Sequence, residues 1–204
     1  LVGEENSDAV HEPSLYSNYC LDDAKRIAPF FGVEFSAESY PSKELVAKSN
    51  KILTAVDNKN FSEVAKKLSS ALWSGNESIL DDLGKEYNAT DKEVSNKLEL
   101  GNLIRNEKDY YFGSAFYYEK ELYWGVDRLH HLEDRLIDLG LKKDLDNKPI
   151  CAPALSAPSK IESEIKVNLY YYPSLNSPYT YVSAKRVREM KEDYPIDLIT
   201  KPVL

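Results

Sequence analysis

The sequence has few of the residues that mark disulfide scaffolds, dithiol redox centres and membrane spans. Only two of its 204 residues are cysteine, Cys20 and Cys151, and no C-x-x-C pair occurs. A dithiol redox centre is therefore excluded, and we expect two free thiols in a reducing compartment, the cytoplasm or an organelle matrix. No apolar run approaches the roughly 18 residues that a membrane-spanning helix needs, so we expect no membrane partner.

Basic residues and histidine are also in short supply. The 26 Lys and Arg are outnumbered by 34 Asp and Glu, which leaves a net charge of -8. Such a chain has no electrostatic reason to bind nucleic acid. The three histidines are His11, His130 and His131. Because adjacent residues on a helix point about 100° apart, His130 and His131 cannot share a ligand, and we predict no metal site.

The sequence does contain a long block with the helical spacing of apolar residues, from residue 20 to 110. Within it we predict helices over residues 21–31, 43–56, 61–73, 78–87 and 91–105. Thr90, followed by Glu93 three residues later, predicts a capping box before the last of these helices. Residues 1–19 are polar and contain Pro13, and we predict a loop there.

The pattern changes after residue 110. Residues 114–125 predict two short strands around a tight turn at Glu119 and Lys120. A helix over residues 127–139 follows, and Gly140 is a typical C-terminal stop. We expect this helix to bury a leucine stripe, which consists of Leu129, Leu132, Leu136 and Leu139. Residues 111–140 therefore form a strand-strand-helix unit.

The last part of the chain predicts the complementary unit. Residues 141–165 carry three prolines and have the composition of a linker. The last block then contains a strand over 165–172, a helix over 178–191 and a strand over 196–200, which fits one βαβ crossover with parallel strands, and we assign residues 166–204 to this unit. The sequence as a whole thus indicates an α/β protein with a helical block inside it.

Ser177 is the first candidate for chemistry. It follows a predicted strand and precedes Pro178, which suits the first helical position because its missing N–H costs nothing there. A helix N-terminus concentrates unpaired N–H groups and partial positive charge, so that Ser177 could hold an anion such as a thiolate. An ordinary N-cap is an equally good interpretation. Acyl transfer is less favoured, because the flanks do not read G-x-S-x-G.

Asp127 is the second candidate. It lies at the start of the helix over residues 127–139, where its carboxylate could accept a hydrogen bond from a ligand amine. The alternative is that Asp127 belongs to the first turn of the helix and that Arg128 pairs on the surface. The sequence by itself leaves both interpretations open.

Four segments together resemble one family, the 2-hydroxychromene-2-carboxylate isomerases and kappa-class glutathione transferases of the DsbA-like thioredoxin superfamily. Residues 166–187, with Ser-Pro-Tyr at a helix start, resemble the opening of that family. Residues 112–136 resemble its closing hairpin, its aromatic-Gly-x-Asp-Arg motif and its last helix. Residues 71–87 resemble its helical insertion, and residues 1–35 resemble the segment after its second strand.

The order of these segments differs from the family, in which the Ser-Pro-Tyr unit comes first. Either the chain is a circular permutant with residues 141–165 joining the old ends, or it is a middle piece of a tandem protein. The resemblance implies a thioredoxin-like fold with an inserted helical domain, in permuted order. Residues 166–204 would then pair with residues 114–125 in one sheet, within one chain or by segment exchange in a homodimer.

The resemblance also implies glutathione as cofactor. By matching position, Ser177 would be the catalytic residue, holding the glutathione sulfur as a thiolate, and Pro178 and Tyr179 would line the site beside it. The thiolate would attack a small electrophilic substrate, or add reversibly to an unsaturated one and permit cis–trans isomerisation.

The remaining implied contacts with glutathione come from the hairpin. Ser114 would supply backbone hydrogen bonds, and Ala115 stands where the family has a cis-proline. Val126 and Asp127 would meet the γ-glutamyl end, with Asp127 binding its amine. Two other functions are open: a thioredoxin-fold binding or regulatory module that has lost catalysis, and a disulfide oxidoreductase. The last is disfavoured because Ser177 cannot form a disulfide.

Overall fold

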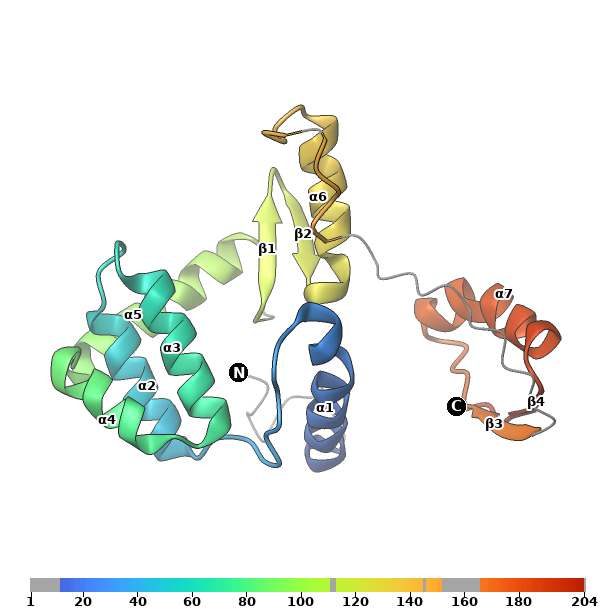
Figure 1. Ribbon diagram of the computed structural model, residues 1–204, viewed down its shortest axis with the longest axis horizontal. Helices are drawn as coiled ribbons and strands as arrows, with labels where there is room; N and C mark the ends of the chain where they lie inside the picture. Colours follow the sequence, from blue (N-terminus) through green and yellow to red (C-terminus); the bar gives the residue numbers. More distant parts are fainter. Residues whose placement is uncertain (1–11, 111–112, 145, 152–165, 204) are drawn as a thin grey trace. The chain divides into compact units, whose positions relative to one another are not determined.

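The computed structural model describes residues 12–110, 113–144, 146–151 and 166–203 (Figure 1). The chain divides into two compact units, Leu1–Ala154 and Leu155–Leu204. The division falls within the predicted linker over residues 141–165, of which residues 145 and 152–165 lie outside the described residues. The first part of the loop predicted over residues 1–19 lies outside them as well.

The described residues form α-helices, short 3-10 helices and strands, so that the α/β class is confirmed. In the first unit these are α1 (Pro13–Ile27), η1 (Ala28–Phe31), α2 (Lys43–Ala55), α3 (Phe61–Ser74), α4 (Glu77–Glu86), α5 (Asp91–Glu107), β1 (Ala115–Tyr118), β2 (Glu121–Trp124), η2 (Val126–Arg128) and α6 (Leu129–Asp138). In the second unit they are β3 (Val167–Tyr171), α7 (Pro178–Asp193) and β4 (Ile196–Thr200).

Helix α1 corrects the prediction of a loop over residues 1–19. It begins at Pro13, whose fixed φ angle and missing N–H suit the first helical position, so that this proline starts the helix instead of breaking it. The N–H of Tyr16 donates to the carbonyl of Glu12 at 3.0 Å and closes the first turn. Leu21 is the residue that α1 buries. The chain then turns away after η1 at Gly32, which has a φ of 63°.

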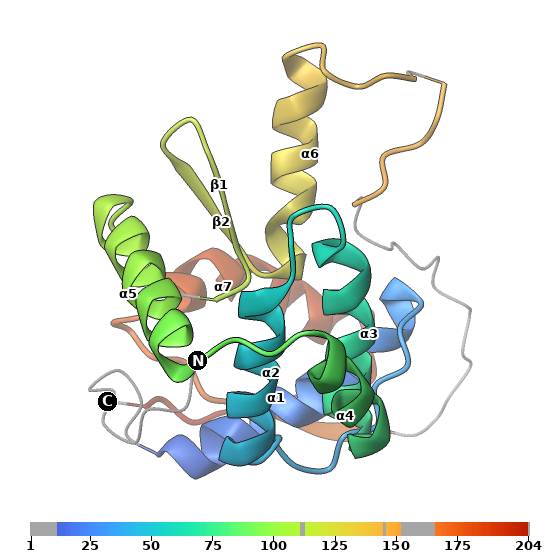
Figure 2. The ribbon, with the colours of Figure 1, turned by 90° about the vertical axis from the view of Figure 1, so that its left-hand side faces the viewer.

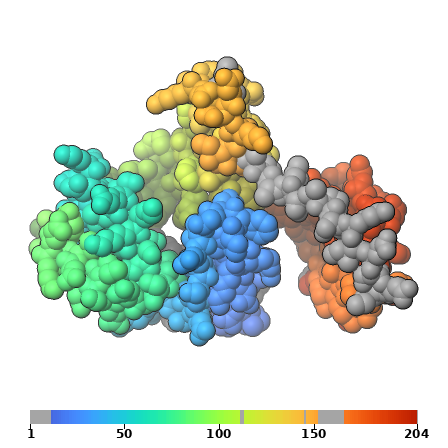
Figure 3. Space-filling model, viewed as in Figure 1, coloured from blue at the N-terminus to red at the C-terminus, as the bar shows by residue number. Residues whose placement is uncertain are grey.

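The hydrophobic core lies among α2, α3 and α4. These helices lie side by side in both ribbon views (Figures 1 and 2), and the space-filling view shows their atoms in contact (Figure 3). Its buried residues are Ile52, Val56, Val64, Leu68, Ala71, Leu80 and Leu83. Ile52 and Val56 of the chain around α2, and Val64 and Leu68 of α3, are spaced by four residues, which puts each pair on one buried face. Phe61, at the start of α3, is 45 % exposed.

Side chains at the helix starts fix where these helices begin. Ser42 accepts a hydrogen bond from the N–H of Leu45 at 3.3 Å, and Asn76 accepts one from the N–H of Ile79 at 3.4 Å. At α5 the predicted capping box is confirmed. Thr90 accepts from the N–H of Glu93 at 3.3 Å, and the Glu93 carboxylate accepts from the N–H of Thr90 at 2.8 Å.

The predicted hairpin and its helix are confirmed, with one correction. Tyr118 pairs with Glu121, and the two turn residues between them have φ angles of 45° and 72°, the sign that a two-residue type I′ turn needs. Arg135 of α6 pairs with Glu119 at 3.5 Å and with Glu121 at 3.7 Å, and so ties α6 to the hairpin.

The predicted leucine stripe of α6 is the part that needs correction. No residue of α6 is buried, and Leu139 is 44 % exposed. The reason is that β2 and η2 are the only helix or strand neighbours of α6 within the described residues, and a two-stranded sheet cannot cover a whole helix face. Gly140 ends the helix as predicted, with a φ of 71°.

The second unit is the predicted βαβ crossover. Strands β3 and β4 are parallel, with Val167 opposite Ile196 and Tyr171 opposite Thr200, and α7 connects them and packs against β4. None of the described residues in this unit is buried. A two-stranded sheet with a single helix has too little apolar surface to enclose a core.

The prediction that residues 166–204 pair with residues 114–125 is wrong for the chain by itself. The described strands form two separate two-stranded sheets, β1–β2 and β3–β4. Both pairings are local: a tight turn joins β1 to β2, and one helix joins β3 to β4. A shared sheet would also require closure of the longer loop that includes residues 141–165, at a greater cost in conformational entropy.

Candidate functional site

Ser177 occupies the N-cap position of α7, with φ and ψ angles of -95° and 121°. Its carbonyl accepts a hydrogen bond from the N–H of Thr180 at 3.1 Å, and its own N–H donates to the carbonyl of Ser174 at 3.1 Å. The side chain makes no cap hydrogen bond and is half-buried. Ser177 is therefore the N-cap residue of α7 by position, but its hydroxyl does not hydrogen-bond to the N–H groups of the first turn.

The loop before α7 is held in place by its neighbours. The N–H of Ser174 donates to the hydroxyl of Thr180 at 3.2 Å, and the N–H of Val203 donates to the carbonyl of Pro173 at 2.8 Å. Ser174 also forms a parallel bridge with Val203. These contacts join the carboxyl end of β3, the start of α7 and the segment after β4, at the edge of a parallel sheet where α/β proteins bind ligands.

Pro178 and Tyr179 occupy the first turn of α7 on the solvent side. Pro178 stands at the start of the helix, as predicted, and is exposed. Tyr179 is 64 % exposed. Both are therefore available to a ligand that approaches the helix start from solvent, although neither encloses one.

The other predicted residues meet at the open end of the hairpin. Ala115 pairs with Trp124, and the carbonyl of Ser114 accepts a hydrogen bond from the N–H of Gly125 at 3.1 Å. The geometry thus brings four predicted residues together, namely Ser114, Ala115, Val126 and Asp127. Ser114 has a φ of 53° and is exposed, so that its backbone turns sharply before β1.

Ala115 shows how this site differs from the resembled family. The described residues contain no cis peptide bond, so that the bond before Ala115 is trans. Ala115 is the first residue of β1 and lies opposite Trp124. A trans backbone therefore stands at the position where the family has its cis-proline.

Asp127 lies in η2 and forms an ion pair with Arg128. This arrangement agrees with the interpretation of Asp127 as a first-turn acid beside a surface Arg. The carboxylate has acceptor sites for about four hydrogen bonds, so that one guanidinium contact leaves room for a ligand amine. Its placement depends on Gly125, whose φ and ψ are 82° and 165°. A Cβ atom on Gly125 would lie 2.9 Å from Oδ1 of Asp127.

The predicted site residues therefore fall into two groups. Ser177, Pro178 and Tyr179 belong to the unit Leu155–Leu204, and the hairpin residues belong to the unit Leu1–Ala154. Each group is brought together by local pairing within its own unit. A single site that includes both groups requires the two units to associate.

A thiol and two phenols form a contact that the sequence analysis missed. The side chains of Tyr16 and Tyr40 both lie close to the thiol of Cys20. The thiol raises the pKa of Tyr16 through a side-chain hydrogen bond, and burial raises the pKa of Tyr40. The ring of Tyr40 also packs edge-on against Trp73 at 5.6 Å between centroids. Tyr16 and Cys20 are four residues apart and are therefore neighbours on a helix. The sequence analysis missed this contact because it predicted a loop for residues 1–19.

Glu133 forms the second contact that the sequence did not reveal. Its carboxylate accepts hydrogen bonds from the N–H of Ile150 at 2.7 Å and from the N–H of Cys151 at 2.5 Å. These two bonds fasten residues 150–151 to α6, and they lower the pKa of Glu133 below its ordinary value of 4.5. Burial and the neighbouring Glu133 carboxylate raise the pKa of the Cys151 thiol. Cys151 is thus held in its thiol form.

We expect this fastening to be lost in acid. Because the pKa of Glu133 is lower in the folded state, the contact stabilises the fold above the unfolded pKa and is lost as the pH falls through the folded pKa, below 4.5. Amide hydrogen exchange at Ile150 and Cys151 should accelerate there beyond its intrinsic pH dependence. Glu133→Gln should accelerate exchange already at neutral pH, whereas Asp134→Asn should not. Unchanged exchange in Glu133→Gln would contradict the role of the carboxylate.

Comparisons with known proteins do not assign the chain to a family, since no family model, no curated protein and no solved structure matches it. Among the described residues, no helix is long and apolar enough to cross a membrane. The same residues contain no group of three or more His, Cys, Asp or Glu side chains that could hold a metal ion.

Proposed function

We propose that the chain is a glutathione-dependent isomerase or transferase, in which Ser177 holds the sulfur of glutathione as a thiolate. The observation that carries this proposal is the position of Ser177 at the start of a 16-residue helix, with a hydroxyl that makes no cap hydrogen bond. A free O–H donor beside the positive end of a helix dipole favours the charged form of a bound thiol.

The proposed chemistry needs only a thiolate and an acceptor. Glutathione loses its thiol proton on binding, because the Ser177 hydroxyl and the helix start stabilise the negative sulfur. The thiolate then attacks a small electrophile, forming a carbon–sulfur bond as the leaving group departs. With an unsaturated substrate, it adds to the double bond, rotation follows, and elimination returns the thiolate and the isomerised product. The chemistry suits a reducing compartment such as the cytoplasm.

The thioredoxin-like arrangement is part of the same proposal. The βαβ unit of residues 166–204 and the strand-strand-helix unit of residues 111–140 are the two halves that such a fold combines. We place the hairpin group at the γ-glutamyl end of glutathione, where Asp127 accepts a hydrogen bond from the amine. This placement requires the two halves to associate between two copies of the chain, because the described strands of one chain form separate sheets.

A second candidate is a binding or regulatory module without catalysis. The trans peptide before Ala115 favours it because the cis turn of the family is missing, and the ion pair of Asp127 with Arg128 favours it because it uses a carboxylate that glutathione would need. A disulfide oxidoreductase has less support, because serine at position 177 cannot form the disulfide.

Calorimetric titration with glutathione tests the proposal on the whole chain. We expect saturable binding at millimolar concentration and an affinity about tenfold lower in Ser177→Ala, because one hydrogen bond to a charged sulfur is lost. Ser183→Ala is the matched control, since the Ser183 hydroxyl donates to the carbonyl of Thr180 at 3.2 Å, one turn further along α7. Equal affinities for Ser177→Ala and the parent would remove Ser177 from the site. No binding to the parent would favour the second candidate.

A further inference from the structure

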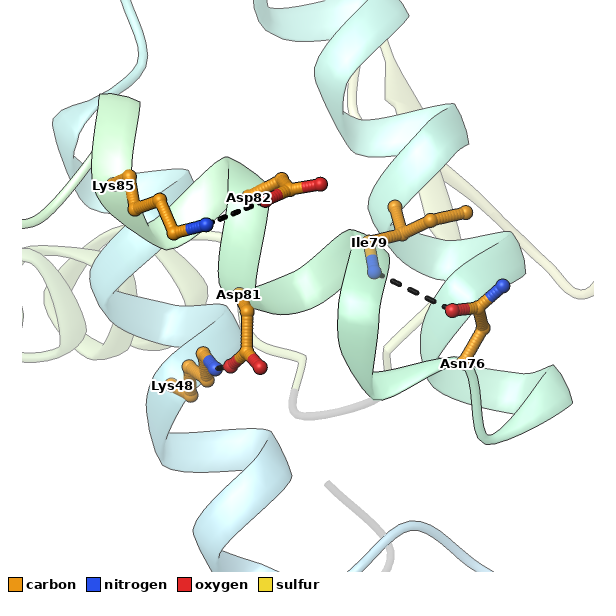
Figure 4. A network of polar contacts seen from close by, with 6 residues as sticks. All are labelled: Lys48, Asn76, Ile79, Asp81, Asp82 and Lys85. Atoms are coloured by element: carbon orange, nitrogen blue, oxygen red, sulfur yellow. Dashed lines mark hydrogen bonds and ion pairs between the residues drawn. The ribbon is translucent and has the colours of Figure 1, made fainter.

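A pocket of 420 Å³ lies between α2 and α4, at a distance in sequence from every residue of the proposed glutathione site. Its lining residues are Lys48, Lys51, Ile52, Asp81, Gly84, Lys85 and Asn88. The volume falls in the range of pockets that bind small molecules, about 300 to 1,000 Å³. Figure 4 shows part of the lining, with Lys48 of α2 directed at Asp81 of α4.

The lining gathers three lysines, although the chain is acidic. One carboxylate lies in the lining itself, Asp81, which pairs with Lys48. Two further carboxylates stand next to the lining and pair with its lysines: Asp82 with Lys85 at 2.7 Å, and Asp91 with Lys51 at 2.7 Å. Both carboxylates are more than half exposed, which weakens their hold on the lysines.

Each of the three ammonium groups retains hydrogen-bonding capacity. An ammonium carries three N–H donors, and Lys48, Lys51 and Lys85 each have one carboxylate partner. An anion in the pocket can therefore accept from donors that the aspartates leave unused.

The remaining lining residues shape the space. Ile52 is 1 % exposed and gives the pocket a rigid apolar base, because it belongs to the core of the helical block. Gly84 lies inside α4, where a Cβ atom would lie 3.4 Å from Cε of Lys48 and would reduce the room beside that lysine. Asn88 adds an amide that can donate to a ligand oxygen.

We propose that this pocket binds the phosphate group of a small anion, either inorganic phosphate or a phosphate monoester. A phosphate group at pH 7 carries a charge of about −1.5 to −2 and three strong acceptor oxygens, which can take up the ammonium donors that the three aspartates leave unused. Lysine ammonium groups from two helices surround it as point charges, the way in which lysine binds phosphate. The site is independent of Ser177 and of the function proposed above.

The test is to titrate the whole chain with inorganic phosphate and, separately, with glycerol phosphate. Amide chemical shifts locate the binding site, and calorimetry measures the affinity. We expect saturable shifts at Gly84 and Asn88, and an affinity about tenfold lower in Lys48→Gln/Lys85→Gln. The matched control is Lys66→Gln/Lys97→Gln, which removes the same charge outside the pocket and should leave the affinity unchanged. Tighter binding of glycerol phosphate would assign the site to a monoester, and equal binding would assign it to free phosphate.

Gly84→Ala tests whether the phosphate occupies the pocket, because this substitution changes the space in the pocket without changing its charge. An alanine inside α4 should raise the melting temperature of the chain, because glycine is the poorer helix former. It should nevertheless weaken phosphate binding, because the methyl group takes up space beside Lys48. No saturation with either probe, or an equal loss of affinity in the pocket and control variants, would overturn the proposal.

Discussion

Leu80→Ala is expected to lower the free energy of unfolding of the helical block by about 3 kcal/mol, because it empties the centre of the core among α2, α3 and α4. Leu80 has an exposure of 0 %, and it is one of the two largest fully buried side chains among the described residues. Helices that pack on three sides cannot close over the space that a leucine leaves, so that the cost includes lost transfer energy and a residual cavity.

Urea denaturation measures this decrease in the free energy of unfolding. The unfolding is monitored by the fluorescence of Trp73 in a Trp124→Phe background. Trp73 lies on α3 and reports on the helical block, whereas Trp124 lies on the hairpin. Leu98→Ala is the control, since Leu98 on α5 is 46 % exposed and its truncation should cost less than about 1 kcal/mol. A loss below about 1 kcal/mol for Leu80→Ala would mean that the core is not packed around Leu80.

Gly125→Ala is expected to open the hairpin locally, with a cost of about 2 kcal/mol. The φ and ψ angles of Gly125, 82° and 165°, lie in a region that is essentially restricted to glycine. The added Cβ atom would also lie 2.9 Å from Oδ1 of Asp127. Both effects fall on the residue that joins Ser114 to Asp127, so that the hairpin group of the proposed site should be disturbed directly.

Amide hydrogen exchange across β1 and β2 should rise by a factor of about 30 in Gly125→Ala, which corresponds to the expected 2 kcal/mol. Adding Asp127→Ala removes the clash but keeps the backbone strain, and should restore part of the protection. Gly101→Ala is the control, because Gly101 lies within α5 with no atom near its Cβ position, and alanine there should stabilise the helix. Unchanged protection in Gly125→Ala would contradict the backbone argument.

The helical block could be predicted because its signals are local and agree with one another. The spacing of Ile52 and Val56, and of Val64 and Leu68, places them on buried faces of α2 and α3. The capping box of Thr90 appears in the sequence as a pattern and in the structure as hydrogen bonds. Turn residues, helix stops and the parallel βαβ crossover could be predicted for the same reason.

The failures have physical causes that a sequence pattern does not reveal. Pro13 was interpreted as a helix breaker, but the same proline at the first helical position begins α1. The leucine stripe of α6 is correctly spaced yet half-exposed, because burial depends on which neighbours are present. The contacts of Cys20 with Tyr40, and of Glu133 with Ile150, join residues whose proximity depends on how the chain folds back.

The candidate site shows the same division. The sequence by itself determined that Ser177 precedes a helix, that Asp127 lies in a first turn, and that each belongs to a strand-and-helix unit, because these properties depend on neighbouring residues. Only the tertiary structure decided that β1–β2 and β3–β4 form separate sheets, that the Ser177 hydroxyl does not cap α7, and that three lysines from two helices line one pocket. The pocket depends on contacts between distant segments, which local propensity does not encode. The two sheets stay separate because short loops cost less chain entropy to close than the long one that a shared sheet would need.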